Sequence, residues 1–290
     1  MIKNIICPAK INLFLEITGR REDGYHTLDT LMHTVSLADT LTIDITRGEE
    51  NIKLAANGST PIPTDERNIA YRAAQKYISS FEIKGYDVSV IIDKKIPVSA
   101  GLGGGSTDGA GVLRALESVF NVGDKETLDK IALSIGADVP FCMYGGCMRA
   151  KGIGEILSPV SEIPKDMFIV IAKGELGVNT AKAYSDIDKL PDYTKKSADE
   201  MVKRIENKDK SFTDLLFNRF EDSVLIDIPE IRLIKEELLR FGALSSLMSG
   251  SGSAVYAFFE DEKNASAACE SLIRRGIFAC VTSAFGKADF

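Results

Sequence analysis

The sequence is poor in the residues from which metal sites and disulfide frameworks are built. It has only two histidines, His26 and His33, and neither has partners at the spacing of a zinc site. Its five cysteines are an odd number, lack a paired C-x-x-C spacing and stand among apolar residues. We therefore expect reduced, buried thiols and no structural metal.

Long apolar runs and an excess of positive charge are also missing. No stretch approaches the roughly 20 apolar residues of a membrane-spanning helix. The chain carries 35 Lys and Arg residues against 42 Asp and Glu residues, a net charge of −7, so no basic field attracts nucleic acid. Strand-like residues begin too close to Met1 for a targeting segment. We expect a cytoplasmic protein that binds neither nucleic acid nor a membrane.

The length and the distribution of patterns favour two mixed domains. The chain has 290 residues, of which 44% are hydrophobic, enough for one large or two small domains. The pattern changes near residue 160, so we expect an N-terminal domain at 1–159 and a C-terminal domain at 160–290. Alternating and helical spacings occur in both, which predicts an α+β fold. The charged stretch 189–210 reads as an irregular, solvated connection.

A glycine-rich stretch that runs into a helix is the most informative feature. Four of the five residues Gly101–Gly105 are glycines, and Ser106, Thr107 and Asp108, all good N-cap residues, follow them. Apolar residues at helical spacing then continue to Phe120. Loop amides and the positive end of a helix dipole converge there, which predicts a phosphate site.

Two common phosphate loops are excluded by single positions. A Walker-type loop needs Lys directly after its last glycine, where this chain has Ser106. The dinucleotide fingerprint needs a glycine at position 106 or 108, where Ser106 and Asp108 stand. The remaining alternative, a flexible surface linker, does not explain why the glycines run into a capped amphipathic helix.

The stretch from Pro97 through Gly101 to Asp108 resembles the central phosphate-binding motif of the GHMP kinases, which include galactokinase, homoserine kinase and mevalonate kinase. Three further segments resemble one branch, the 4-diphosphocytidyl-2-C-methyl-D-erythritol kinases. They are Pro8-Ala9-Lys10-Ile11-Asn12, Gly24-Tyr25-His26 and Gly136-Ala137-Asp138-Val139-Pro140. The segment 247–256 resembles the third GHMP motif, a loop that closes over the phosphates.

The resemblance implies a fold and an activity. The fold is the two-domain GHMP kinase fold, with an N-terminal domain like domain 2 of ribosomal protein S5 and a ferredoxin-like C-terminal domain. The activity is ATP-dependent phosphorylation of the 2-hydroxyl of 4-diphosphocytidyl-2-C-methyl-D-erythritol, giving the 2-phosphate and ADP, in isopentenyl diphosphate biosynthesis. ATP and Mg²⁺ are the expected cofactors, and a monomer or weak homodimer is the expected state.

The resemblance also assigns roles residue by residue. Lys10 and Asp138 are the expected catalytic pair, with Asp138 as the base. The expected ATP-binding residues are Asn68, Lys94, Pro97, Gly101, Gly103, Gly104, Gly105, Ser106, Thr107 and Asp108. The expected substrate-binding residues are Asn12, Tyr25, His26, Asp138, Thr180 and Tyr184. Relatives usually carry Ser where Asn179 stands. No convincing glutamate accompanies Ser106 as a Mg²⁺ ligand, so we expect phosphates and water to hold the ion.

Each of these residues also has a purely structural interpretation. The alternation at 5–17 predicts a half-buried strand with Lys10 and Asn12 on its second face, which could be a solvated outer face. Tyr25 and His26 could pack over a turn, Asn68 could be only an N-cap, and Lys94 only a solvated strand end. Asp138 could be a turn residue, because Pro140 should hold Val139 extended.

Two other functions stay open at this level. Another GHMP kinase, acting on mevalonate, homoserine or a sugar, would share the glycine loop but not the pairing of Pro-Ala-Lys-Ile-Asn with Gly-Tyr-His. A ligand-sensing protein on a retired kinase fold would be expected to lack Lys10 or Asp138, and both are present.

Overall fold

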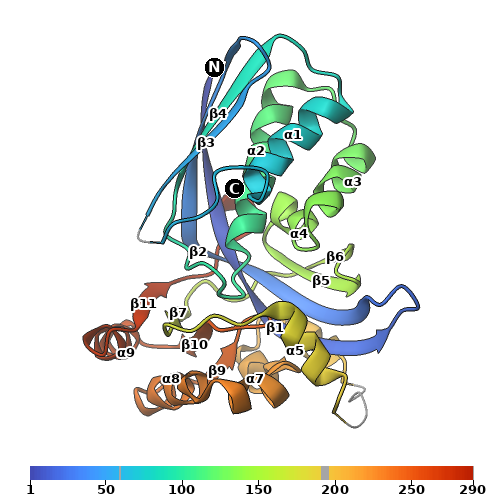
Figure 1. The fold of residues 1–290 in the computed structure, drawn as a ribbon. Coiled ribbons are helices and arrows are strands. Elements are labelled where there is room, and N and C mark those ends of the chain that lie inside the picture. Colours follow the sequence, from blue (N-terminus) through green and yellow to red (C-terminus); the bar gives the residue numbers. More distant parts are fainter. Residues whose placement is uncertain (59, 191–195, 290) are drawn as a thin grey trace.

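Two β-sheets, each covered by helices, make up the described part of the molecule. The computed structural model describes residues 1–58, 60–190 and 196–289. In Figure 1 the first sheet stands above the second, with α1, α2 and α3 against one of its faces. Among the described residues, no helix is both long and apolar enough to cross a membrane. The expectation of a mixed α and β fold is confirmed.

The first sheet has seven strands in the order β3-β4-β2-β1-β8, with β5 paired to β2 and β6 to β5. Its two longest strands, β1 and β2, pair antiparallel over almost their whole length and continue from the upper half of Figure 1 into the lower half. The strands are β1 (Ile2–Arg20), β2 (His26–Arg47), β3 (Ile52–Asn57), β4 (Tyr86–Asp93), β5 (Cys147–Gly152), β6 (Ile156–Val160) and β8 (Phe217–Asn218).

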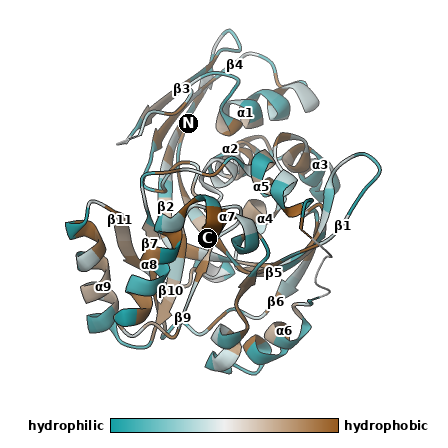
Figure 2. Ribbon diagram, turned by 60° about the horizontal axis from the view of Figure 1, so that its bottom comes forward, coloured by the Kyte–Doolittle hydropathy of each residue, from teal (hydrophilic) through white to brown (hydrophobic). Residues whose placement is uncertain are grey.

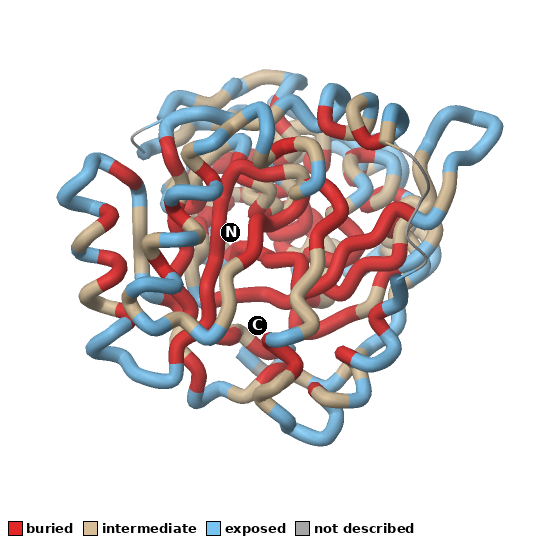
Figure 3. The backbone as a smooth tube through the Cα atoms, turned by 90° about the horizontal axis from the view of Figure 1, so that it is seen from below, coloured by how far each residue is buried: buried red, intermediate tan, exposed pale blue. Residues whose placement is uncertain are grey.

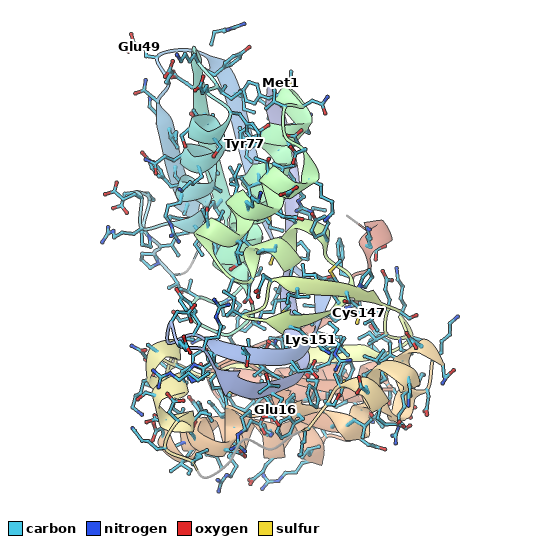
Figure 4. The ribbon with its side chains drawn as sticks, turned by 90° about the vertical axis from the view of Figure 1, so that its right-hand side faces the viewer. Met1, Glu16, Glu49, Tyr77, Cys147 and Lys151 are labelled. Atoms are coloured by element: carbon cyan, nitrogen blue, oxygen red, sulfur yellow. The ribbon has the colours of Figure 1, made fainter. Side chains whose placement is uncertain are left out.

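Four helices cover this sheet: α1 (Ile69–Ser80), α2 (Gly104–Phe120), α3 (Lys125–Ile135) and α4 (Val139–Tyr144). The predicted N-cap of α1 is confirmed, since the Asn68 side chain accepts a hydrogen bond from the Ala70 N–H. The hydroxyl of Tyr77, labelled in Figure 4, donates to Glu117 at 2.7 Å and so ties α1 to α2.

The second sheet has four antiparallel strands in the order β11-β7-β10-β9. They are β7 (Phe168–Lys173), β9 (Ser245–Met248), β10 (Val255–Phe259) and β11 (Phe278–Thr282). Helices α8 (Pro229–Arg240) and α9 (Glu262–Arg274) pack against this sheet through buried apolar side chains such as Leu238 and Leu272. Figure 2 shows the hydrophobic colour on these strands and hydrophilic segments on the two helices.

The remaining elements are α5 (Thr180–Ile187), α6 (Asp199–Glu206), α7 (Glu221–Asp227) and the short 3₁₀ turns Lys210–Leu215 and Lys287–Asp289. The prediction of an irregular connection at 189–210 is wrong over α6, and residues 191–195 lie outside the described part. Five of the eight residues of α6 are charged, but Met201 and Ile205, four apart, are both buried on one side of the helix.

Strand β1 is buried on both faces, and the prediction of a half-buried strand is wrong. Every residue from Cys7 to Ile17 is buried, because apolar residues such as Ile11 pack against the second sheet while Lys10 and Asn12 are enclosed on the other face. In Figure 3 the buried segments, coloured red, lie in the middle of the molecule, with exposed segments around them. Polar side chains enclosed in this way need partners.

Candidate active site

A cavity of about 820 Å³ opens between the glycine loop, the β1–β2 hairpin and α5. Lys10 and Asp138 line it near the glycines, while Tyr25 and Tyr184 line it toward the hairpin. A smaller cavity of about 270 Å³ shares Gly101, Gly103 and Ser106 with the first. The structure thus brings most of the predicted site residues to two adjoining hollows.

Lys10 lies at the centre of the site and is only 4% exposed. Its ammonium donates to Asn12 Oδ1 at 2.7 Å and lies 3.4 Å from Asp138 Oδ2. A Cβ at Gly103 would come within 2.9 Å of Lys10 Cγ, so only glycine allows the loop to lie against this side chain. The alternative of a solvated strand lysine is therefore wrong.

A chain of hydrogen bonds holds Lys10 in place. Asn12 Nδ2 donates to Thr30 Oγ1 at 2.9 Å, and the Thr30 hydroxyl donates to the Phe14 carbonyl at 2.7 Å. From the second sheet, the buried Tyr256 hydroxyl donates to the Asn12 carbonyl at 2.8 Å. Thr30 had no sequence signal, and Tyr256 lies in the predicted third motif without any sign of its contact to β1, because each residue is far along the chain from Asn12.

Asp138 stands at the start of α4, and its side chain is 40% exposed. The prediction that Val139 is extended is wrong: Val139 and Pro140 form the first turn of α4, where proline's missing N–H needs no acceptor. The Asp138 carboxylate makes no capping bond to its own backbone. It is left to face Lys10 and the cavity.

Helix α2 begins earlier than the sequence predicts. Its N-cap is Gly103, at φ +70°, and not Ser106, Thr107 or Asp108, which lie within the first turns of the helix. The amides that open a helix have no partners within it, so those of Gly104 to Ser106 are placed for an anion. Ser106 lines both cavities, whereas Thr107 is 1% exposed and its hydroxyl has no hydrogen-bond partner among the residues that the structure describes.

A second glycine loop, 249–254, lies directly against the first. The Ser249 hydroxyl donates to the Gly101 carbonyl at 3.0 Å, and a Cβ at Gly101 would lie 2.0 Å from the Ser249 carbonyl oxygen. Asn218, which the sequence did not reveal, donates to the carbonyls of Met248 and Gly250 at 2.7 Å each. The expected substrate residue Thr180 touches the same loop through Ser251, at 2.9 Å.

Lys94 is neither exposed nor directed at open solvent, so a solvated strand end is excluded. Its ammonium bridges the buried carboxylates of Asp39, at 2.5 Å, and Asp108, at 2.9 Å. Burial would lower the pKa of Lys94, but the two carboxylates outweigh burial and raise it. Burial raises the pKa of Asp108 to about 7, with Lys94 opposing the rise and Asp39 adding to it.

The smaller cavity contains the other residues that were expected to bind ATP. Asn68 lines it while capping α1 and donating to the Pro63 carbonyl at 2.8 Å, and Pro97, Gly104 and Gly105 line it too. Asn68 therefore has a structural role and also borders the cavity. Lys94 borders the same cavity, although its ammonium is already paired with the carboxylates of Asp39 and Asp108.

The far end of the large cavity is made of side chains. Tyr25 at the hairpin tip is 62% exposed, while His26 stacks on Tyr184 with ring centroids 4.6 Å apart and an angle of 18°. Tyr184 in turn meets Phe220 edge-on at 4.8 Å. Burial, with the charge of Asp138, raises the pKa of Tyr184 to about 12, so its hydroxyl is neutral. His26 also lies 2.7 Å from Asp188, which sequence reasoning missed.

The cysteines confirm the expectation of unpaired thiols. Cys7, Cys142, Cys147 and Cys269 are buried, Cys280 is partly so, and all are free. Burial raises the pKa of each of these thiols, which makes them poor nucleophiles. In the described part of the chain, no three His, Cys, Asp or Glu side chains gather in a group that could hold a metal ion.

Comparison with protein-family models finds a match in each half of the chain. Residues 68–146 match the GHMP kinases N terminal domain, and residues 198–277 match the GHMP kinases C terminal domain. The 4-diphosphocytidyl-2-C-methyl-D-erythritol kinase of Clostridium acetobutylicum is 39% identical over 266 residues, which cover 90% of this chain and 92% of that protein.

Comparison with solved structures agrees with the family match. A crystal structure of 4-(cytidine 5'-diphospho)-2C-methyl-D-erythritol kinase superposes with a TM-score of 0.80 at 31% identity, covering 98% of this chain and all of that one. A mevalonate kinase from L. major has a TM-score of 0.76 at 18% identity, covering 98% of this chain and 97% of its own, a likeness of fold alone. The two-domain fold expected from the motifs is confirmed.

Proposed function

The chain belongs to the GHMP kinases and, among them, to the 4-diphosphocytidyl-2-C-methyl-D-erythritol kinases, and from that premise we propose how its site works. It transfers the γ-phosphate of ATP to the 2-hydroxyl of 4-diphosphocytidyl-2-C-methyl-D-erythritol, giving the 2-phosphate and ADP in the methylerythritol phosphate route to isopentenyl diphosphate. One observation supports this proposal most directly. A single cavity has the glycine loops at one end, Tyr25, His26 and Tyr184 at the other, and Lys10 and Asp138 between them.

The glycine end fits the phosphates of ATP. The amides at the start of α2 have no side-chain cap, and a Cβ at Gly101 or Gly103 would collide with the neighbouring loop or with Lys10. Such a surface can approach phosphate oxygens closely and bind them through N–H groups. The nucleoside then reaches the smaller cavity bordered by Asn68 and Pro97, which shares this loop.

The central pair fits the chemistry of the transfer. As the bond from the γ-phosphorus to the ADP oxygen breaks and a bond to the 2-oxygen forms, the hydroxyl proton passes to Asp138. Lys10, 3.4 Å from that carboxylate and enclosed by protein, stabilises negative charge on the reacting oxygens. Asn12 accepts from Lys10 and so holds the ammonium in position.

Mg²⁺ would lie beside Ser106, whose side chain borders both cavities. When bound it neutralises phosphate charge. The donor set fits an ion held mainly by phosphate oxygens and water, with one hydroxyl from the protein.

The hairpin end fits the cytidine moiety. The exposed ring of Tyr25 offers a stacking face, and the imidazole of His26 offers polar atoms for a pyrimidine edge. Thr180 and Tyr184, on α5, border the path from the ring to the reacting centre. The substrate would therefore extend along the cavity with its alcohol at Asp138.

Turnover by the purified protein tests this assignment. With MgATP we expect ADP and a new phosphomonoester from 4-diphosphocytidyl-2-C-methyl-D-erythritol, and none from mevalonate, homoserine or galactose, with EDTA abolishing the reaction. Phosphorylation of one of the latter three alcohols in its place would overturn the assignment. Tight binding of the cytidine compound with no ADP formed would point instead to a ligand-sensing protein.

A further inference from the structure

Helix α5 presents three polar residues, four apart, to the cavity. Thr180 meets Ser251 of the second glycine loop at 2.9 Å, Tyr184 stacks on His26, and Asp188 follows directly after the helix. Residues four apart in a helix lie on one face, so the helix places all three along the cavity wall. Thr180 and Tyr184 already have roles in the proposed function, whereas Asp188 has none.

Asp188 divides its two oxygens between neighbours on the β1–β2 hairpin. Oδ1 lies 2.7 Å from His26 Nε2, and Oδ2 accepts from Arg20 Nη1 at 3.1 Å. Arg20 and His26 are directly opposite each other in the two strands, so the Asp188 carboxylate bonds to both residues of the last pair of the hairpin. A carboxylate only accepts hydrogen bonds, and Nε2 must therefore carry the proton that lies between it and Asp188.

The state of the other ring nitrogen follows from this bond. In a neutral imidazole with hydrogen on Nε2, Nδ1 carries a lone pair and accepts. Arg20 Nη1, 3.1 Å from Oδ2, shares the Asp188 carboxylate with His26. His26 Nδ1 has no hydrogen-bond partner among the described residues, and the ring borders the cavity beside Tyr25 and Tyr184.

We infer that Asp188 is a positioning residue, which holds His26 with an acceptor nitrogen toward the bound base and makes the site prefer a pyrimidine with an amino group over one with a carbonyl at the same place. This rests on the proposed function. Cytosine carries an exocyclic amino group that donates, where uracil carries an oxygen that accepts. An acceptor at Nδ1 pairs with the former and repels the latter.

The histidine tautomer can be read without any substrate. The chain has only two histidines, so nitrogen-15 NMR of histidine-labelled protein gives two rings. His33 serves as the internal reference, because its Nδ1–H donates to the Thr34 carbonyl at 2.6 Å and its Nε2 accepts from the Ile163 N–H. We expect His26 as the Nε2–H form and His33 as the Nδ1–H form. A His26 found as Nδ1–H, or as the imidazolium, would overturn the inference whatever the activity.

Exchange of Asp188→Asn should reverse the tautomer. Arg20 would keep the amide oxygen as its acceptor, which turns the amide NH₂ toward His26 Nε2 and moves the ring proton to Nδ1. We expect the preference in kcat/KM for the cytidine substrate over its uridine analogue to fall about tenfold or more, with kcat for the cytidine substrate nearly unchanged. Asp188→Ala, which frees the ring, should also lower the preference.

A matched control lies two residues away. Asp186→Asn, on the same helix, removes a carboxylate that pairs with Lys182 and Lys189, and it should leave the preference as it is. A wild type that prefers cytidine, with both Asp188 variants keeping that preference, contradicts the inference but leaves the proposed function standing. A wild type that phosphorylates neither compound contradicts the proposed function, while the NMR result still decides the tautomer.

Discussion

The two ends of the large cavity are built from different materials. At the phosphate end the surface is backbone: two glycine loops touch each other and enclose Lys10, which is 4% exposed. At the base end the surface is side chain: Tyr25 is 62% exposed, and the contacts are a ring stack and a shared carboxylate. Charge that develops in a transition state needs a rigid dipole array, whereas a planar base needs a face and a few directed polar atoms.

The two ends should therefore fail in different ways. Damage to the backbone end should lower turnover or ATP binding, because close approach of amides to phosphate is lost. Damage to the side-chain end should raise the KM for the cytidine substrate and leave ATP binding alone. Asp138 and Lys10, which lie between the ends, should control kcat.

The largest effect is expected where the two ends meet. Asp138→Asn removes the basic oxygen but keeps the size of the side chain, so kcat should fall by about 10²- to 10⁴-fold while both KM values change little. Steady-state release of ADP measures this, with ATP binding by the variant as the control for folding. Near-normal turnover would remove Asp138 as the base.

The next largest effect tests the backbone end. In Gly101→Ala the new Cβ would lie 2.0 Å from the Ser249 carbonyl oxygen at a residue with φ +75°, so the two loops must separate. We expect kcat/KM for ATP to fall about 10²-fold, the usual effect of displacing reacting groups by about 1 Å.

Gly24→Ala, at the base end, is the matched control for that variant. Its φ is +89° but no atom lies within 4 Å of the added Cβ, so it carries the backbone strain without the collision. Its kcat/KM for ATP should stay near the wild-type value. An equal loss of ATP efficiency in both variants would show that strain alone, and not contact between the loops, accounts for the effect.

A smaller effect is expected at the base end itself. Tyr25→Ala removes one stacking face, worth about 1–3 kcal/mol, so the KM for the cytidine substrate should rise roughly tenfold or more. Since Tyr25 is mostly exposed, the melting temperature should not change. A parallel rise in the KM for ATP would break the division between the two ends.

The smallest effect concerns the ion cluster behind the phosphate loop. The pKa of Asp108 is raised from its ordinary 3.8 to about 7 by burial, against Lys94, so the folded protein holds this proton more tightly than the unfolded chain does. The free energy of unfolding therefore falls as pH rises from about 4 to 7. Asp108→Asn should lose less stability over this range than the wild type does.

The wild type and Asp108→Asn must be compared, because His33 changes the free energy of unfolding with pH in the opposite direction. Burial lowers the pKa of His33 to about 4, which makes stability rise with pH between about 4 and 6.5. His33 is present in both proteins, so its contribution cancels in the difference. Urea unfolding of both proteins at pH 5 and pH 7.5 measures this difference. An identical change in the free energy of unfolding with pH in the two proteins would show that Asp108 does not titrate in this range.

The sequence was most informative where one short segment makes a whole structure. The N-cap at Asn68 is local, because capping involves neighbours within about four residues. The start of α2 was placed too late because three good N-cap residues follow the glycines, and helix α4 was missed because Pro140 was expected to hold Val139 extended.

By itself the sequence determined the family, the glycine loop and the identity of Lys10 and Asp138 as candidates, since motifs are contiguous and their chemistry depends on residue type. The tertiary structure alone decided that β1 is enclosed on both faces, that Lys94 is held by Asp39 and Asp108, and that Asn218 and Asp188 support the two ends of the cavity. Those partners are tens to hundreds of residues apart in the chain. Only the packing of the two sheets brings them together, and no local pattern records it.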